Sequence, residues 1–208
     1  NISDFIVQAL DEEKYVPEFR TPEYAGHAHE LARQAAADGV DVVVAVGGDG
    51  TVNEVASALV NTESVFAVIP CGSGNGLARH QHIPINIKGA IRVINEGKVR
   101  HLDYGTMGDK PFFCTCGVGF DAFVSQKFAE GGKRGFMSYI EKTLREGVRY
   151  KSETYTIEYE DRVDRQQAFL IACANASQYG NNAYIAPEAS MEDGLMDITI
   201  IKPFNTIL

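Results

Sequence analysis

Two glycine-rich segments carry residue types suited to binding phosphate. Residues 47–51 read Gly-Gly-Asp-Gly-Thr, residues 72–76 read Gly-Ser-Gly-Asn-Gly, and each segment follows an apolar run. A glycine-rich turn between a buried strand and a helix presents unpaired backbone N–H groups near the positive end of the helix dipole, where anions bind. We therefore interpret both segments as loops that hold phosphate groups.

An acid inside the first loop needs its own explanation. Because Asp49 would repel phosphate, we expect it to hold Mg²⁺, often through water, or to handle the hydroxyl group of an acceptor. Thr51 and Asn53 can donate hydrogen bonds to phosphate, and Glu54 can orient Asn53 or a metal-bound water. The structural alternative is a tight strand–helix turn in which Asp49 is only a helix cap.

The residues before position 98 predict an α/β nucleotide-binding domain of Rossmann-like type. Residues 41–46 and 65–69 are apolar runs typical of parallel strands buried on both faces. Helical patterns cover residues 2–10, 52–59 and 87–97, and a further helix follows Gly76. Thr21 and Pro22 predict the start of a helix that ends at Gly39. Loops that follow adjacent parallel strands converge on one crevice, where open α/β sheets bind ligands.

The residues after position 98 predict a mainly antiparallel β domain. Strand-like patterns cover residues 101–107, 112–118, 154–160, 168–174 and 196–202, and a two-part helical insert covers residues 121–148. We place the domain boundary between residues 98 and 99, which gives domains 1–98 and 99–208.

Charge and hydropathy exclude two classes of protein. The net charge of −9 argues against a nucleic-acid partner, and no apolar stretch is long enough to span a membrane. Without a recognisable signal peptide, we expect a cytoplasmic protein that touches the membrane only peripherally. The pairs His27/His29 and His80/His82 suggest a metal site, but we interpret them as surface histidines, because side chains two apart on a helix diverge.

One segment has the opposite charge to the rest of the chain. Residues 127–151 contain seven Lys or Arg against three Glu, a net charge of +4 that leaves −13 elsewhere. Because aromatic residues are interleaved with these charges, we predict that the segment faces anionic lipid. The alternative is an ordinary solvated helix whose aromatic side chains fill the core.

Four segments in order resemble the diacylglycerol kinase catalytic-domain family, which includes sphingosine kinases and bacterial lipid kinases. Residues 46–55 are similar to its nucleotide loop and residues 70–84 to its second loop, with Ser73 in place of Thr and Gly76 in place of Asp. Residues 117–122 and 185–197 are similar to two later motifs. The resemblance implies an α/β nucleotide domain followed by a β-sandwich, with the active site between them.

The resemblance also implies roles for particular residues. Contacts with ATP are expected from Thr21, Gly47, Gly48, Asp49, Gly50, Thr51, Val52, Asn53, Gly72 and Ser73. A Mg²⁺ ion is implied at the Asp193 carboxylate and the carbonyl groups of Ser190 and Leu195. For Asp193 and Gly194 a hairpin turn is the equal alternative. Asp49 and Asp121 are the acids best placed to assist catalysis.

The function implied is an ATP-dependent lipid kinase, with diacylglycerol as the default acceptor and sphingoid bases or phosphatidylglycerol as alternatives. An NAD kinase-like enzyme and a non-catalytic nucleotide- or lipid-binding regulator stay open, as does a homodimer. The family's general base belongs to a Val-Asp-Gly-Glu-like segment near the C-terminus, and an Asn-Pro-x-Ser-Gly-like turn follows its first strand. Neither segment is in the sequence, so we expect little or no kinase activity if these 208 residues are the whole polypeptide.

Overall fold

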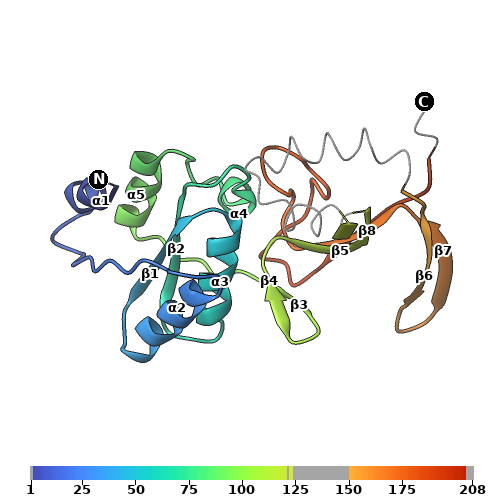
Figure 1. The fold of residues 1–208 in the computed structure, drawn as a ribbon, viewed down its shortest axis with the longest axis horizontal. Coiled ribbons are helices and arrows are strands. Elements are labelled where there is room, and N and C mark those ends of the chain that lie inside the picture. Colours follow the sequence, from blue (N-terminus) through green and yellow to red (C-terminus); the bar gives the residue numbers. More distant parts are fainter. Residues whose placement is uncertain (1, 121, 124–149, 205–208) are drawn as a thin grey trace.

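The computed structural model of the chain describes residues 2–120, 122–123 and 150–204 (Figure 1). An α/β half carries most of the helices, and a β half contains antiparallel strands. This arrangement confirms the predicted fold class. No helix in these described ranges is long and apolar enough to cross a membrane.

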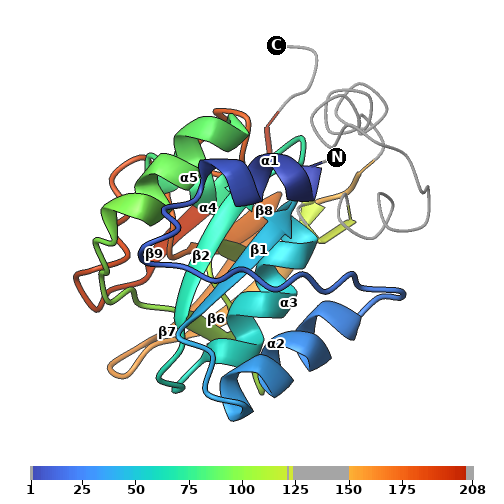
Figure 2. The same cartoon turned by 90° about the vertical axis from the view of Figure 1, so that its left-hand side faces the viewer.

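The α/β half is built around two parallel strands. β1 (Val42–Gly47) pairs with β2 (Val65–Pro70) from Val42 opposite Val65 to Gly47 opposite Pro70. Helices α2 (His27–Ala37) and α3 (Asp49–Leu59) cover one face, and α1 (Ile2–Ala9) and α5 (Ile87–Glu96) cover the other (Figure 2). α4 (Gly76–His80) follows β2. The predicted strands and most of the predicted helices are confirmed.

The two faces of this sheet bury different side chains, because successive residues of a strand point to opposite faces. Ala45 and Val68 pack with the α2 and α3 side chains, whereas Val44 and Ile69 pack with α1 and α5. The strands are therefore apolar on both faces, as the uninterrupted apolar runs predicted.

The ends of the helices follow their capping residues. The Asn86 side chain caps α5 by accepting a hydrogen bond from the Gly89 N–H at 2.8 Å, and Gly97 ends the helix with a φ of +67°. The predicted start of α2 at Thr21 is wrong, since the helix begins at His27 after Gly26, which has a φ of +89°. The Glu23 N–H instead donates to the His27 Nδ1 atom at 3.0 Å, which forms a turn before the helix.

The β half contains three antiparallel groups of strands. β5 (Thr115–Gly119), β8 (Leu170–Ala174) and β9 (Asp197–Ile201) form one sheet in the order β5-β8-β9. β3 (Gly105–Met107) pairs with β4 (Lys110–Phe112), and β6 (Glu153–Glu158) pairs with β7 (Val163–Ala168). The prediction of antiparallel strands is confirmed, but the predicted strand 112–118 is interrupted at residues 113–114. The predicted helical insert 121–148 lies outside the described residues, apart from positions 122–123.

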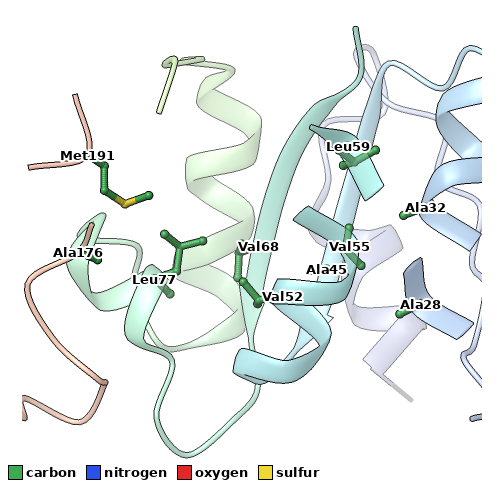
Figure 3. Close-up of a cluster of buried hydrophobic side chains, with 11 residues drawn as sticks. Ala28, Ala32, Ala45, Val52, Val55, Leu59, Val68, Leu77, Ala176 and Met191 are labelled. Atoms are coloured by element: carbon green, nitrogen blue, oxygen red, sulfur yellow. The ribbon is translucent and has the colours of Figure 1, made fainter. Parts of the chain in front are cut away.

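The two halves share one hydrophobic core. Leu77 and Ala78 of α4 belong to the same buried cluster as Ala176 and Met191, which come from loops of the β half (Figure 3). The Gln81 side chain extends this contact by donating to the Met191 sulfur at 3.3 Å. This shared core holds the second glycine-rich segment against the β half.

Candidate functional site

The two glycine-rich loops lie against each other at the carboxyl ends of β1 and β2. A Cβ atom on Gly72 would lie 2.5 Å from the Gly48 Cα atom, too close for any side chain. The Cys71 N–H donates to the Gly47 carbonyl oxygen at 2.8 Å, which extends the parallel pairing to the start of the second loop. The structure thus brings together the two loops that the sequence predicted to converge.

The Asp49 carboxylate ties the first loop to the second. Its Oδ2 atom accepts a hydrogen bond from the Asn75 N–H at 2.9 Å, and its Oδ1 atom accepts one from the Gly76 N–H at 2.7 Å. These N–H groups belong to the start of α4, so Asp49 caps a neighbouring helix and not its own. A carboxylate has about four lone-pair positions, so Asp49 keeps acceptor capacity for a metal ion or a hydroxyl group.

Asn75 holds the second loop in its shape. Its side chain accepts from the Gly72 N–H at 2.9 Å and donates to the Gly72 carbonyl oxygen at 2.7 Å. Asn75 is only 4% exposed and has a φ of +53°, a left-handed conformation that asparagine tolerates better than most residues. The exposed residue Ser73 therefore lies within a loop that is fixed from inside.

The remaining predicted nucleotide residues differ in what they can offer a ligand. The N–H groups of Asp49, Gly50 and Thr51 precede the first internal hydrogen bond of α3, from the Val52 N–H to the Gly48 carbonyl oxygen at 3.0 Å, so they can donate to phosphate. Val52 itself has its side chain in the core and its N–H already bonded. Asn53 is exposed on α3.

Two further residues of this region have separate surroundings. Thr21 is exposed on the irregular segment before α2. Glu54 accepts a hydrogen bond from the Gly26 N–H at 3.0 Å, so it links α3 to the start of α2 and does not orient Asn53. The role of Thr21 in nucleotide binding stays a prediction.

His80 lies at the contact between the two halves. Its Nδ1 atom accepts a hydrogen bond from the Ser177 N–H at 3.1 Å and lies 3.0 Å from the Ser177 hydroxyl oxygen. Burial lowers the pKa of His80, and the nearby charges of His82 and Arg100 lower it further. The interpretation of His80 as a surface histidine is therefore wrong: it is a partly buried residue that joins the halves.

The predicted metal ligands lie in one irregular loop. The Asp193 Oδ1 atom accepts from the Leu195 N–H at 3.0 Å, and the Ser190 hydroxyl accepts from the Glu192 N–H at 3.2 Å. The alternative of a hairpin turn at Asp193 is not found, because β9 pairs with β8 and no strand immediately precedes the turn.

An open cavity lies beside this loop, and its lining mixes polar with apolar side chains. The cavity has a volume of about 280 Å³, and its lining includes Asp103, Asn175 and Leu195. Asn175 is 1% exposed, and its Oδ1 atom has no hydrogen-bond partner. Oxygen acceptors are the ligands that Mg²⁺ prefers, directly or through water. In the described part of the chain no group of three or more His, Cys, Asp or Glu residues could hold a metal, so a site here would depend on carbonyl and amide oxygens as well.

Asp103 is a residue that sequence reasoning missed. Its Oδ2 atom accepts from the Gly194 N–H at 2.7 Å, and its own N–H donates to the Met191 carbonyl oxygen at 2.7 Å. Asp103 lies in the segment that joins the halves and holds the 190–195 loop, about 90 residues further along the chain. Nothing in its local pattern signalled this contact.

Asp121 and residues 127–149 lie outside the described residues, and with them most of the predicted lipid-facing segment. Of that segment, Tyr150 packs against Phe120, Phe123 and Phe169 with ring centroids 5.5 to 5.6 Å apart. Burial raises the pKa of Tyr150 to about 12, with hydrogen bonding to Tyr155 adding to the effect. Tyr150 is therefore partly buried and packs against an aromatic cluster.

Two protein-family models match the chain. Residues 2–107 match the model of the diacylglycerol kinase catalytic domain, and residues 114–207 match the model of the YegS C-terminal NAD kinase beta sandwich-like domain. A solved structure from Bacillus anthracis, described as a diacylglycerol kinase, superposes with a TM-score of 0.71 at 26% identity and covers 89% of this chain and 62% of that one.

Two relatives show how much of the length is shared. A Chromohalobacter salexigens protein named "Probable lipid kinase YegS-like" is 31% identical over 188 residues, which cover 88% of this chain and 60% of the relative. A Bacillus subtilis protein named "Diacylglycerol kinase" is 28% identical over 206 residues, or 96% of this chain and 68% of the relative. The chain thus spans about three fifths to two thirds of the length of these relatives.

Proposed function

Because this chain belongs to the diacylglycerol kinase catalytic-domain family, we propose that it transfers the terminal phosphate of ATP to the hydroxyl group of a lipid. The observation that carries this proposal is the Asp49 carboxylate, which joins two glycine loops and still has acceptor capacity. The names of the relatives make a lipid the first acceptor to test, with diacylglycerol ahead of sphingoid bases and phosphatidylglycerol.

In this proposal the α/β half holds the nucleotide. The N–H groups at the start of α3 and the exposed Ser73 donate to the phosphates, where the helix dipole favours negative charge. Gly48 and Gly72 let the two loops approach each other closely, because a Cβ atom on Gly72 would lie 2.5 Å from the Gly48 Cα atom. Gly47 and Gly50 are proposed as further nucleotide contacts of the first loop. Thr51 and Asn53 add side-chain donors, and Thr21 is proposed as a further contact.

The metal is proposed to bind in the β half. Asp193 and the carbonyl groups of Ser190 and Leu195 would hold Mg²⁺, and the adjacent oxygens of Asp103 and Asn175 suit its bound waters. When bound, Mg²⁺ neutralises negative charge near the transferring phosphate. Asp103 and Asp193 themselves keep the 190–195 loop in shape through their backbone hydrogen bonds.

Phosphoryl transfer depends mainly on positioning and charge neutralisation. A bond forms between the lipid oxygen and the terminal phosphorus, the bond from that phosphorus to the bridging oxygen breaks, and the hydroxyl proton passes to a carboxylate. We propose that Asp49 and Asp121 assist this step, Asp49 through the lone pairs that α4 leaves unused. The acceptor would approach from the β half, with residues 127–151 toward the membrane surface of a cytoplasmic protein.

The direct test uses the full-length protein with Mg²⁺ and labelled ATP. Diacylglycerol, sphingosine, phosphatidylglycerol and NAD are offered in parallel to the natural protein and to Asp49→Ala. We expect label in one lipid and a loss of at least about a hundredfold in the variant, the size of effect seen when a transition-state contact is removed. Label in NAD alone would assign the protein to the NAD kinases, and bound ATP without transfer would favour a regulator.

A further inference from the structure

A loop of the β half rests on the second glycine loop. We call residues 177–184 the docking loop. A Cβ atom on Gly180 would lie 2.7 Å from the carbonyl carbon and oxygen of Gly74, a separation that real Cβ atoms essentially never show. Gly180 also has a φ of +112°, which disfavours any side chain. The close approach of the two loops therefore requires glycine at position 180.

The docking loop is held by hydrogen bonds within itself and to the α/β half. The Asn182 N–H donates to the side-chain oxygen of Gln178 at 3.1 Å, and Gln178 is 2% exposed. The Ala183 N–H donates to the Gly180 carbonyl oxygen at 2.9 Å. At its start, the Ser177 N–H is bonded to His80 of α4. The loop thus has its own internal hydrogen bonds and an anchor on the α/β half.

The contact converges on the peptide unit that joins Gly74 and Asn75. Its carbonyl oxygen accepts from the Asn181 N–H at 3.1 Å and from the Arg79 Nε–H at 3.0 Å. Its N–H group, which belongs to Asn75, donates to the Asp49 Oδ2 atom at 2.9 Å. Because a peptide unit is planar and stiff, a displacement of its carbonyl group also displaces its N–H group.

We propose that Gly180 is a positioning residue, through which the docking loop holds the Gly74–Asn75 peptide unit and thereby the Asp49 carboxylate in place for phosphoryl transfer. The inference rests on the proposed function, in which the Asp49 carboxylate assists the transfer of the proton from the acceptor hydroxyl. It gives the β half a second task besides receiving the lipid: aligning an acid of the nucleotide half. The Asp49 carboxylate is bonded directly to the start of α4, and the docking loop reaches it only through the Gly74 carbonyl group.

The first test measures this coupling without using activity. Gly180→Ala is compared with Gly108→Ala, a matched control, because Gly108 also has a positive φ of +64° but nothing within 4 Å of a Cβ atom. Hydrogen exchange of the Asn75 and Gly76 amides, both bonded to Asp49, is followed by NMR. We expect these amides to exchange at least about tenfold faster in Gly180→Ala, because local opening becomes easier, and no change in Gly108→Ala.

The second test measures the reaction in the full-length protein. We expect kcat to fall about ten- to hundredfold in Gly180→Ala, the loss that a displacement of about 1 Å produces, with a smaller change in the KM for ATP. Gly108→Ala should keep its kcat. Arg79→Met removes another donor to the Gly74 carbonyl oxygen and should also lower kcat. This variant provides the test if Gly180→Ala does not fold.

The outcomes separate the two proposals. Unchanged exchange of the Asn75 and Gly76 amides in both Gly180→Ala and Arg79→Met would overturn the inference, whatever the activity. Equal losses of kcat in Gly180→Ala and Gly108→Ala would overturn it as well, because the effect would then come from backbone strain alone. The Asn75 and Gly76 amides could also exchange faster in Gly180→Ala while the natural protein transfers no phosphate. That result would support the contact between the docking loop and Asp49 and would reject the proposed kinase function.

Discussion

The two glycine loops of the α/β half and the two functional loops of the β half are held in different ways. Asn75 folds the second glycine loop by bonding back to Gly72, three residues away. The 190–195 loop depends on Asp103, 91 residues away, and the docking loop depends on Gly74 and His80 of the other half. The comparison teaches that a residue within the second glycine loop gives this loop its shape, whereas contacts with distant residues position the two loops of the β half.

The largest expected effect tests the local side of this comparison. Asn75→Ala removes two hydrogen bonds from a residue that is 4% exposed and leaves the Gly72 backbone groups without partners. We expect the free energy of unfolding to fall by about 3 kcal/mol, measured by urea denaturation. Asn61→Ala is the control, since Asn61 has a similar φ of +59° on the surface and should lose less than about 1 kcal/mol. Equal losses of unfolding free energy in the two variants would show that Asn75 contributes through its backbone conformation alone and not through its side-chain hydrogen bonds.

The next largest effect tests the proposed metal site at the 190–195 loop, which depends on a distant residue. If Mg²⁺ binds beside Asp103 and Asn175, a concentration of ten times its Kd should stabilise the protein by about 1.4 kcal/mol, seen as a rise in Tm that EDTA reverses. Asp193→Asn should abolish this rise, whereas Asp109→Asn, in the turn between β3 and β4, should preserve it. A rise that survives Asp193→Asn would place the metal elsewhere.

A smaller effect comes from the cap at the start of α5 in the α/β half. Asn86→Ala removes the side-chain acceptor for the Gly89 N–H at the start of α5. We expect the free energy of unfolding to fall by about 1 kcal/mol, measured by urea denaturation. A loss of activity at unchanged stability would mean that α5 contributes to the site.

The smallest effect concerns the pH dependence of the contact between the halves. Because burial lowers the pKa of His80 below its ordinary 6.5, the folded state favours the neutral ring. His80 should therefore add stability above about pH 6.5 and lose that contribution as the pH falls toward its folded pKa. His80→Asn keeps an acceptor for the Ser177 N–H but does not titrate. The Tm of the natural protein should fall more between pH 7.5 and 5.5 than that of the variant; parallel curves would exclude His80 as the cause.

The sequence predictions were accurate for features that depend on nearby residues and less accurate for features that depend on distant contacts. The apolar strands β1 and β2 and the glycine loops were predicted correctly, because each depends on a pattern within a few residues. Of β7, only the last residue, Ala168, was predicted to lie in a strand. The segment Val163–Ala168 is largely polar and becomes a strand only by pairing with β6. The start of α2 was misplaced because Gly26 and the ring of His27, stacked on Tyr24 at 4.4 Å, outweigh a favourable capping pattern at Thr21.

The sequence by itself determined the fold class, the parallel pair of strands and the position of both glycine loops, because backbone sterics and hydrophobic periodicity act over short stretches of chain. Only the tertiary structure decided that Asp49 caps α4, that Asp103 holds the 190–195 loop, and that Gly180 rests on Gly74. These contacts join residues 26 to 106 positions apart. They form only when the folded chain brings these distant residues together, and contacts of this kind leave no periodic signal in the sequence.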